Sequence, residues 1–348
     1  MKVLALAHQY VPVRNAGAET MLHGMLSALA RAGHDVHISL SSQVGQPYVH
    51  DGVQVWPRVE GSKPNHFQHL PGAAVLVSHL ENSEVAAYIG HLNEIPVALV
   101  HHNTFAVSRK MLHFYGARVD LVVVNSQWMA ADLAAWHALH DLPVPRTIIV
   151  RPLAGAGFAP AHGPHDRVTQ VNLKKLSPDS GAGIELTKGA ETFWSVAARM
   201  PKTAFLGVTG AYGTQQLEDL PNVEVLGHVP SDQMREQVYS RTRVLLVPSN
   251  YESWGCVATE AVACGIPVIA APTPGLRENL GDAGIYVDWR DVDGYVRELR
   301  RLASPGAYAK QRERVLARAA QHRQMQAEDE ARWVGAVEAI ARKAVPVG

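Results

Sequence analysis

The sequence predicts an α/β protein of two domains, each built on a parallel sheet covered by helices. The 348 residues exceed the length over which one hydrophobic core usually keeps growing. Short apolar, strand-like segments alternate along the chain with helix-like segments, which is typical of parallel sheets covered by helices. Residues 154–166 are rich in Gly, Pro and Ala, and this interruption of the alternation predicts a linker between the domains.

The strand-like segments follow in chain order. In the first domain they are residues 2–7, 36–41, 53–57, 74–80, 97–102, 121–126 and 147–152. In the second domain they are residues 168–173, 204–208, 223–229, 244–248, 268–271 and 285–288. The tail, residues 307–344, is rich in Ala, Arg, Glu and Gln and predicts a helix.

Composition limits the partners and the compartment. Lys and Arg together number 32, and Asp and Glu together also number 32. The net charge is therefore close to zero and does not favour binding to nucleic acid or to an anionic membrane. Peripheral membrane contact through a local basic pocket stays open. Two cysteines form no disulfide framework and favour a reducing cytoplasm. The N-terminal apolar run is too short for a signal peptide, and no run reaches the ~18 residues of a membrane span.

The most informative stretch is residues 247–270, which predicts one βαβ unit carrying two carboxylates. A buried strand ends at residue 247, a loop follows, and a helix over residues 256–264 stops at a glycine before the next parallel strand. Glu252 would sit just outside the carboxyl edge of the sheet, with Glu260 on the helix. Two carboxylates so placed can bind two parts of one extended ligand. The alternative is that Glu252 only caps a helix and that Glu260 is a solvated surface residue.

The P-S-x-x-E-S-W-G entry, the Glu-x7-Glu spacing and the A-C-G-x-P-V-I-A exit together resemble the donor-binding motif of the retaining family 4 glycosyltransferases. These enzymes have the GT-B fold, in which two doubly wound, Rossmann-like domains face each other across a cleft. The resemblance implies that Glu252 binds hydroxyls of the transferred sugar and that Glu260 binds the nucleotide ribose. It also implies that backbone amides at a helix N-terminus face the diphosphate, those of Ser253, Trp254, Gly255 and Cys256.

In the first domain the resemblance extends to the loop after the first strand and to a later strand end. Gly17 stands in the family's glycine loop, although Ala16 occupies a position where a second glycine is common. A plain strand-to-helix turn is the alternative. His102, which follows an apolar strand, matches a histidine that contacts the transferred sugar, with His101 as its competitor. Here the alternative is a histidine satisfied by backbone groups at the sheet edge.

The second domain also offers a cation for the diphosphate. Lys188, followed by a glycine at a helix start, matches the family's K-G pair, and its ammonium would neutralise the departing phosphate in place of a metal. A solvated lysine is the alternative. The family's arginine is missing, because Asn172 and a leucine stand at its position. Asn172 is expected to be one of the donor-binding residues. Lys174 or Lys175 can compensate only in charge, and the role of the loop 174–187 is left open.

No metal or other cofactor is expected. The sequence places histidines three residues apart, but it shows no compact set of three or four ligands that includes a carboxylate or thiolate. The three spaced pairs are His66/His69, His137/His140 and His162/His165. The expected co-substrate is a nucleoside-diphosphate sugar.

The domains are expected at residues 1–155, on the acceptor side, and 166–325, on the nucleotide-sugar side. The last helix, 329–345, is expected to pack back on the first domain. The predicted function is a retaining, metal-independent glycosyltransferase that moves a hexose-like sugar to an acceptor hydroxyl. The sequence does not specify nucleotide, sugar, acceptor or oligomeric state. A GT-B epimerase or phosphorylase, or a non-catalytic sugar-nucleotide-binding protein, stays an alternative. An NAD-dependent oxidoreductase is disfavoured, because no G-x-G-x-x-G follows the first strand.

Overall fold

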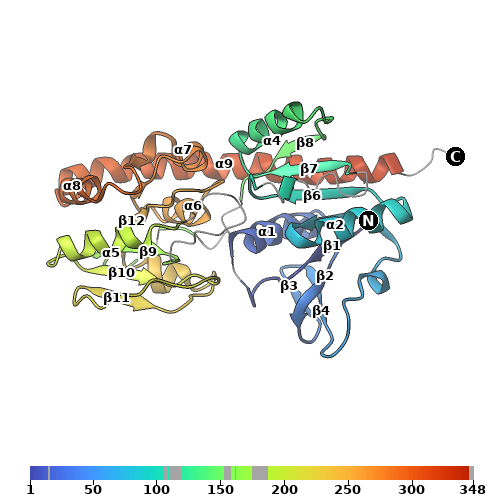
Figure 1. Cartoon of the computed structure of the whole chain (residues 1–348), viewed down its shortest axis with the longest axis horizontal. Helices are drawn as coiled ribbons and strands as arrows, with labels where there is room; N and C mark the ends of the chain where they lie inside the picture. The colour runs from blue at the N-terminus through green and yellow to red at the C-terminus, as the bar shows by residue number, and fades with distance from the viewer. Residues whose placement is uncertain are drawn as a thin grey trace. The chain divides into compact units, whose positions relative to one another are not determined.

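The structure is a computed structural model of the whole chain, which folds into two compact units (Figure 1). It describes residues 1–14, 16–105, 108–109, 119–152, 158–160, 162–174 and 187–344. Unit 1 consists of Met1–Leu153 together with Met325–Gly348, and unit 2 is Ala154–Gln324. None of the helices in these described ranges has the length and apolar character needed to cross a membrane.

Unit 1 is built on an eight-stranded sheet with the order β3-β4-β2-β1-β5-β6-β7-β8. All neighbouring strands are parallel except β3 and β4, which form an antiparallel hairpin. The strands are β1 (Lys2–Ala7), β2 (Asp35–Val44), β3 (Tyr48–His50), β4 (Val53–Arg58), β5 (Ala73–His79), β6 (Val97–His101), β7 (Leu121–Val124) and β8 (Thr147–Ile149). The described helices are α1 (Gly17–Arg31), η1 (His66–His69), η2 (Leu80–Asn82), α2 (Ser83–Asn93) and α4 (Gln127–Leu139).

The sheet of unit 1 has a hydrophobic core on each face. Along β1, Val3 and Ala5 face a core that contains α1, whereas Leu4 and Leu6 face a second core that contains α2 and α4. A parallel strand covered on both faces needs apolar side chains at every position, which explains the continuous apolar run of β1. The predicted doubly wound arrangement is confirmed in this unit.

Unit 2 is built on a six-stranded, entirely parallel sheet with the order β11-β10-β9-β12-β13-β14. The strands are β9 (Arg167–Val171), β10 (Phe205–Val208), β11 (Val223–Leu226), β12 (Thr242–Val247), β13 (Val268–Ala270) and β14 (Ile285–Tyr286). The helices are α5 (Ala190–Arg199), the π-helix η4 (Arg235–Tyr239), α6 (Cys256–Ala263), α7 (Pro274–Leu280), η5 (Gly281–Ala283) and α8 (Val292–Leu302). Leu245 and Val247 face the core of α6 and α7, and Val244 and Leu246 face the core of α5 and α8. Unit 2 is therefore doubly wound as well.

The last helix, α9 (Pro305–Ala344), contributes to the core of both units. Val315 lies in a core of unit 2, whereas Trp333 is fully buried in a core of unit 1. The Trp333 indole Nε1 donates a hydrogen bond to the carbonyl oxygen of Met25 at 2.9 Å. Arg151 forms an ion pair at 3.0 Å with the buried carboxylate of Asp329. These contacts make the C-terminal residues part of unit 1.

Several predicted strands end early, and one strand was missed. The strand predicted over residues 223–229 ends at Leu226, and the one predicted over 147–152 ends at Ile149. Each predicted extension has one valine beside residues that do not continue an apolar strand, Gly227 and His228 in the first case and Arg151 and Pro152 in the second. The missed strand is β3, which pairs with β4 through the two-residue turn Asp51-Gly52.

Candidate functional site

The site of unit 2 lies where the strand order of its sheet reverses. The chain runs outward from β9 to β10 and β11, and in the other direction from β12 to β13 and β14. In doubly wound sheets, ligands bind at the carboxyl ends of the two strands at this switch point. Asn172 follows β9, and Glu252 follows β12. The structure therefore brings residues of these two predicted segments to one edge of the sheet.

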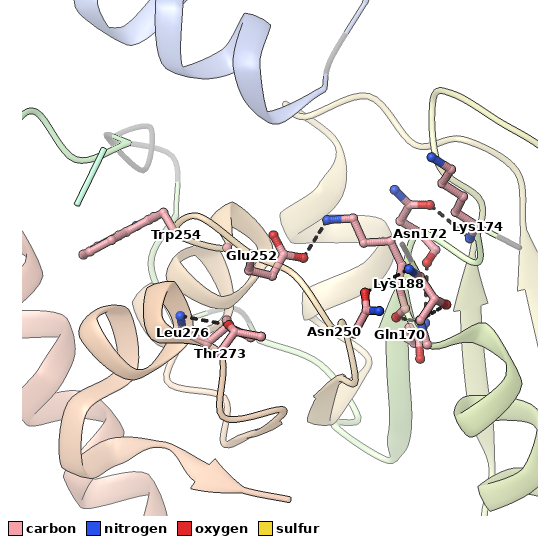
Figure 2. A network of polar contacts seen from close by, with 12 residues as sticks. Gln170, Asn172, Lys174, Lys188, Asn250, Glu252, Trp254, Thr273 and Leu276 are labelled. Carbon is pink, nitrogen blue, oxygen red and sulfur yellow. Dashed lines mark hydrogen bonds and ion pairs between the residues drawn. The ribbon is translucent and has the colours of Figure 1, made fainter. Parts of the chain in front are cut away.

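Lys188 and Glu252, both predicted to be catalytic, form an ion pair. The Lys188 Nζ atom lies 2.6 Å from the Glu252 Oε1 atom, and Figure 2 shows the two side chains pointing toward one another. The lysine side chain is 34% exposed and the glutamate side chain 13% exposed, so solvent still reaches the pair. An anionic ligand that binds the ammonium therefore competes with the Glu252 carboxylate.

The backbone around Lys188 is fixed by hydrogen bonds and by one close approach. Gln170 Nε2 donates to the Lys188 carbonyl oxygen at 2.9 Å, and the Thr187 amide donates to Asn250 Oδ1 at 3.0 Å (Figure 2). Gly189 caps α5 with a φ of 78°, and a Cβ atom there would lie 2.3 Å from the carbonyl oxygen of Pro248. Only glycine fits this position. The K-G pair is thus a lysine held by a glycine that contacts the end of β12.

Glycines also shape the loop that carries Glu252. Gly255 precedes α6 with a φ of 91°, and a Cβ atom there would lie 2.7 Å from Leu276 Cδ2. A Cβ atom on Gly275 would lie 2.3 Å from the carbonyl oxygen of Glu252. Asn279 Nδ2 donates to the carbonyl oxygen of Gly255 at 3.0 Å. The loop is therefore held tightly against the N-terminus of α7.

Trp254 and its neighbours in this loop differ in what their side chains can do. The Trp254 side chain is buried, points away from the Lys188–Glu252 pair in Figure 2, and donates from Nε1 to Thr259 Oγ1 at 2.9 Å. Its indole therefore supports the fold, which leaves only the backbone for the predicted ligand contact. The binding roles predicted for Ser253, Gly255 and Cys256 stay predictions.

Glu260 lies on α6 and is clamped by a tyrosine. The hydroxyl of Tyr239 donates to Glu260 Oε2 at 2.6 Å. Burial raises the pKa of Glu260 to about 7, although the Tyr239 hydrogen bond acts in the opposite direction and part of the side chain reaches the surface. Glu260 therefore changes its charge near neutral pH. Tyr239 is a residue that sequence reasoning missed, since nothing in its neighbourhood points to a carboxylate 21 residues later.

Both cysteine thiols of this segment are held in their neutral form. Burial, and secondarily the nearby Glu260 carboxylate, raises the pKa of Cys256 to about 12 and that of Cys264 to about 12. A thiol with such a pKa is not a nucleophile at neutral pH. The cysteines therefore offer no covalent step at this edge of the sheet.

Asn172 occupies the position where the resemblance places an arginine. Its backbone has a φ of 71°, and its Oδ1 atom accepts a hydrogen bond from the Lys174 amide at 3.1 Å (Figure 2). A Cβ atom on Gly210 would lie 2.5 Å from the same oxygen. Asn172 therefore closes a turn and presents no cation. Lys175 and most of the 174–187 loop lie outside the described residues.

In unit 1, the predicted residues His102 and Gly17 follow strands β6 and β1 of the same sheet. His102 Nε2 lies 3.0 Å from Nδ1 of His79, at the end of β5. Burial lowers the pKa of His79 to about 4 and that of His102 well below its ordinary value. The pair is therefore neutral, with one ring donating to the other. Its competitor His101 is buried within β6. His79 was missed, although a histidine ending a buried strand was a signal that could have found it.

The family follows from comparison with known proteins. Residues 183–304 match the family described as Glycosyl transferases group 1, and this segment contains Lys188, Glu252 and Glu260. This match supports a group 1 glycosyltransferase of the family 4 type. The predicted family 4 resemblance is thereby confirmed.

Curated glycosyltransferases match parts of the chain. A D-inositol 3-phosphate glycosyltransferase from Acidothermus cellulolyticus is 29% identical over 223 residues, or 60% of this chain and 46% of that protein. An O-antigen chain mannosyltransferase B from Escherichia coli is 38% identical over 71 residues, 20% of this chain and 18% of that protein. The chain thus spans about half the length, or less, of these group 1 relatives.

Solved structures of similar fold cover nearly the whole chain. Sucrose-phosphate synthase from Thermosynechococcus elongatus aligns with a TM-score of 0.68 and 18% identity, over 95% of this chain and 100% of that one. HepE from Anabaena, solved in complex with UDP-glucose, aligns with a TM-score of 0.66 and 16% identity, over 99% and 98%. At this identity the likeness shows the fold alone. The predicted GT-B fold class, with two Rossmann-like domains, is confirmed.

Proposed function

We propose that this chain is a retaining, metal-independent glycosyltransferase that moves a sugar from a nucleoside-diphosphate sugar to an acceptor hydroxyl. The observation that carries the proposal is the Lys188–Glu252 pair at the switch point of a doubly wound sheet. A cation and a carboxylate at one sheet edge match the two chemically different parts of such a donor, its diphosphate and its sugar hydroxyls. HepE, a protein of similar fold, binds UDP-glucose.

The described residues can divide the donor between them. The Lys188 ammonium would bind the diphosphate, together with amides at the N-terminus of α6, where the helix dipole favours an anion. Glu252, released from Lys188, would accept hydrogen bonds from sugar hydroxyls. Glu260 would accept from ribose hydroxyls in its ionised form. In unit 1, His102 lies 3.0 Å from His79, and its contact with the sugar stays a prediction.

The reaction needs no group besides donor and acceptor. The bond between the anomeric carbon and the β-phosphate oxygen breaks while the acceptor oxygen bonds to the same face of that carbon. The departing phosphate accepts the acceptor's proton, so the charge that grows on it is the charge that Lys188 stabilises. The neutral thiols of Cys256 and Cys264 supply no covalent nucleophile, in line with substitution on one face.

The test is a donor screen followed by product analysis. UDP- and GDP-sugars that raise the melting temperature are incubated with acceptor hydroxyl compounds, and D-inositol 3-phosphate is tried first because the name of a relative contains it. The anomeric proton coupling of the product by NMR reports retention. Lys188→Ala is expected to lower kcat about 10²–10³-fold. Lys202→Ala, at an exposed lysine of the same unit, is the matched control. A product of inverted configuration would refute the retaining mechanism.

A second candidate is a protein that binds a nucleotide sugar without transferring it. The observation that favours it is Asn172, which closes a turn where a guanidinium is expected. Such a protein would be stabilised by a nucleotide sugar but would form neither a glycosylated product nor free sugar. The same incubation, followed by mass spectrometry, distinguishes the two functions.

A further inference from the structure

A cluster of ligand-type side chains lies in unit 1, on α1 and the β3–β4 hairpin. It consists of His23 on α1, His50 at the end of β3 and Asp51 in the turn that follows. One ligand atom from each residue lies within 4.8 Å of the other two. None of the three belongs to the histidine pairs weighed in the sequence. Within the part of the chain that the structure describes, folding thus brings together three ligand-type residues that the sequence spacing does not group.

The geometry of the cluster is close to that of a zinc site. His23 Nε2 lies 3.1 Å from Asp51 Oδ2. Ligands about 2.0–2.1 Å from a tetrahedral zinc ion lie about 3.3 Å from one another. The rings of His23 and His50 are stacked, with centroids 4.6 Å apart. The ligand atom of His50 lies within 4.8 Å of those of His23 and Asp51.

The residues around the cluster hold two of its members in place. Tyr10 OH lies 2.8 Å from His23 Nδ1, which leaves Nε2 of that ring facing Asp51. Such a hydrogen bond to the second ring nitrogen orients histidines that bind metals. Asp51 and Gly52 have φ values of 46° and 81°, the conformation of a two-residue type I′ hairpin turn. The turn fixes the direction in which the aspartate leaves the backbone.

We propose that His23, His50 and Asp51 bind a divalent transition-metal ion of the zinc type, with water as the fourth ligand. Two imidazoles and one carboxylate suit zinc better than calcium or magnesium, which take oxygen ligands. Asp51 precedes the start of β4, at the amino edge of the parallel sheet, whereas His102 follows a strand at the carboxyl edge. The ion therefore joins the β3–β4 hairpin to α1, at the edge of the unit 1 sheet opposite to that of His102.

The test is metal binding by the full-length protein after dialysis against a chelator. Zinc is added in competition with a chromogenic chelator, and Co²⁺ is added to read the visible bands of a bound ion. We expect one equivalent to bind and to raise the melting temperature by mass action. His50→Gln and Asp51→Asn are each expected to weaken zinc binding at least about tenfold, as losses around metal sites do. Asparagine tolerates the left-handed backbone at position 51.

A matched control and two opposing outcomes complete the experiment. His140→Gln, at an exposed histidine that ends α4, should leave zinc affinity unchanged. All variants should melt at the wild-type temperature without metal, which separates metal loss from misfolding. If the wild type binds no zinc saturably, the site is only a hydrogen-bonded His–Asp pair and the proposal is wrong. It is equally wrong if zinc binds one-to-one with the same affinity in both site variants.

Discussion

Glu252→Gln should change the affinities for a nucleoside diphosphate and for its sugar conjugate in opposite directions. In the structure the carboxylate of Glu252 forms an ion pair with the ammonium of Lys188, with 2.6 Å between Nζ and Oε1. Binding of a diphosphate to Lys188 must first disrupt this ion pair. Glutamine keeps the shape of the side chain but removes its charge, so the ammonium becomes available to the ligand.

The magnitude follows from the exposure of the pair. Two unit charges this close interact by about 1.6 kcal/mol in water and about 6 kcal/mol at an effective dielectric constant of 20. Because Lys188 is 34% exposed, solvent and side-chain entropy reduce the net value to about 0.2–1 kcal/mol. Affinity for UDP or GDP should therefore rise by up to about fivefold. The nucleotide sugar also loses its bond to a charged acceptor, about 1.5–3 kcal/mol, so its affinity should fall by about 0.5–3 kcal/mol in net, or about 2–100-fold.

Calorimetric titration of the wild type, Glu252→Gln, Lys188→Met and the double variant measures both effects. The double-mutant cycle isolates the coupling between the two side chains. With Lys188→Met in place, Glu252→Gln should no longer improve nucleotide binding. A drop in affinity for the unconjugated nucleoside diphosphate in Glu252→Gln would refute the competition described here.

Three further predictions test other parts of the site. The affinity for a nucleotide sugar should fall about tenfold for each pH unit below about 7, because only ionised Glu260 accepts hydrogen bonds from both ribose hydroxyls. The diphosphate diester of the ligand does not titrate in this range. Glu260→Gln should give a flat profile by calorimetry, and a wild-type profile equally flat would contradict the ribose role. Turnover measured at low temperature should survive EDTA, because Lys188 takes the place of a metal; loss of activity restored by magnesium or manganese would show otherwise. Gly189→Ala should lower the free energy of unfolding by more than the ~1–2 kcal/mol of a left-handed alanine, because its Cβ would meet Pro248. Gly306→Ala, where a Cβ meets nothing within 4 Å, is the control by thermal unfolding.

The strands and the motif could be predicted because both depend on local pattern. Parallel strands covered on both faces appear as continuous apolar runs, and β12, α6 and β13 lie where the pattern places them. Gly255 and Gly265 bound the predicted helix and have positive φ values of 91° and 74°. The sequence pattern predicts such features because residues close together in the chain determine them.

The edge strand β3 and the partners of the site residues could not be predicted in the same way. Tyr48–His50 is only three residues long, although the Asp51-Gly52 pair that follows is a strong hairpin signal that was not used. Tyr239 meets Glu260 and His79 meets His102 only because separate strands and helices bring them together. Pairings of this kind depend on strand order, which one sequence does not encode visibly.

Helix α9 has a consequence for the order in which the chain can fold during synthesis. Unit 2 is one uninterrupted segment, so all of its residues have been synthesised before residue 325 is added. The core of unit 1 is completed later, because it includes the Trp333 indole, which packs against Met25, a residue 308 positions earlier. The N-terminal half of the protein therefore emerges first and is completed last. A nascent chain that stops short of Trp333 leaves α1 with exposed apolar surface, so a segment translated late protects one translated much earlier from aggregation.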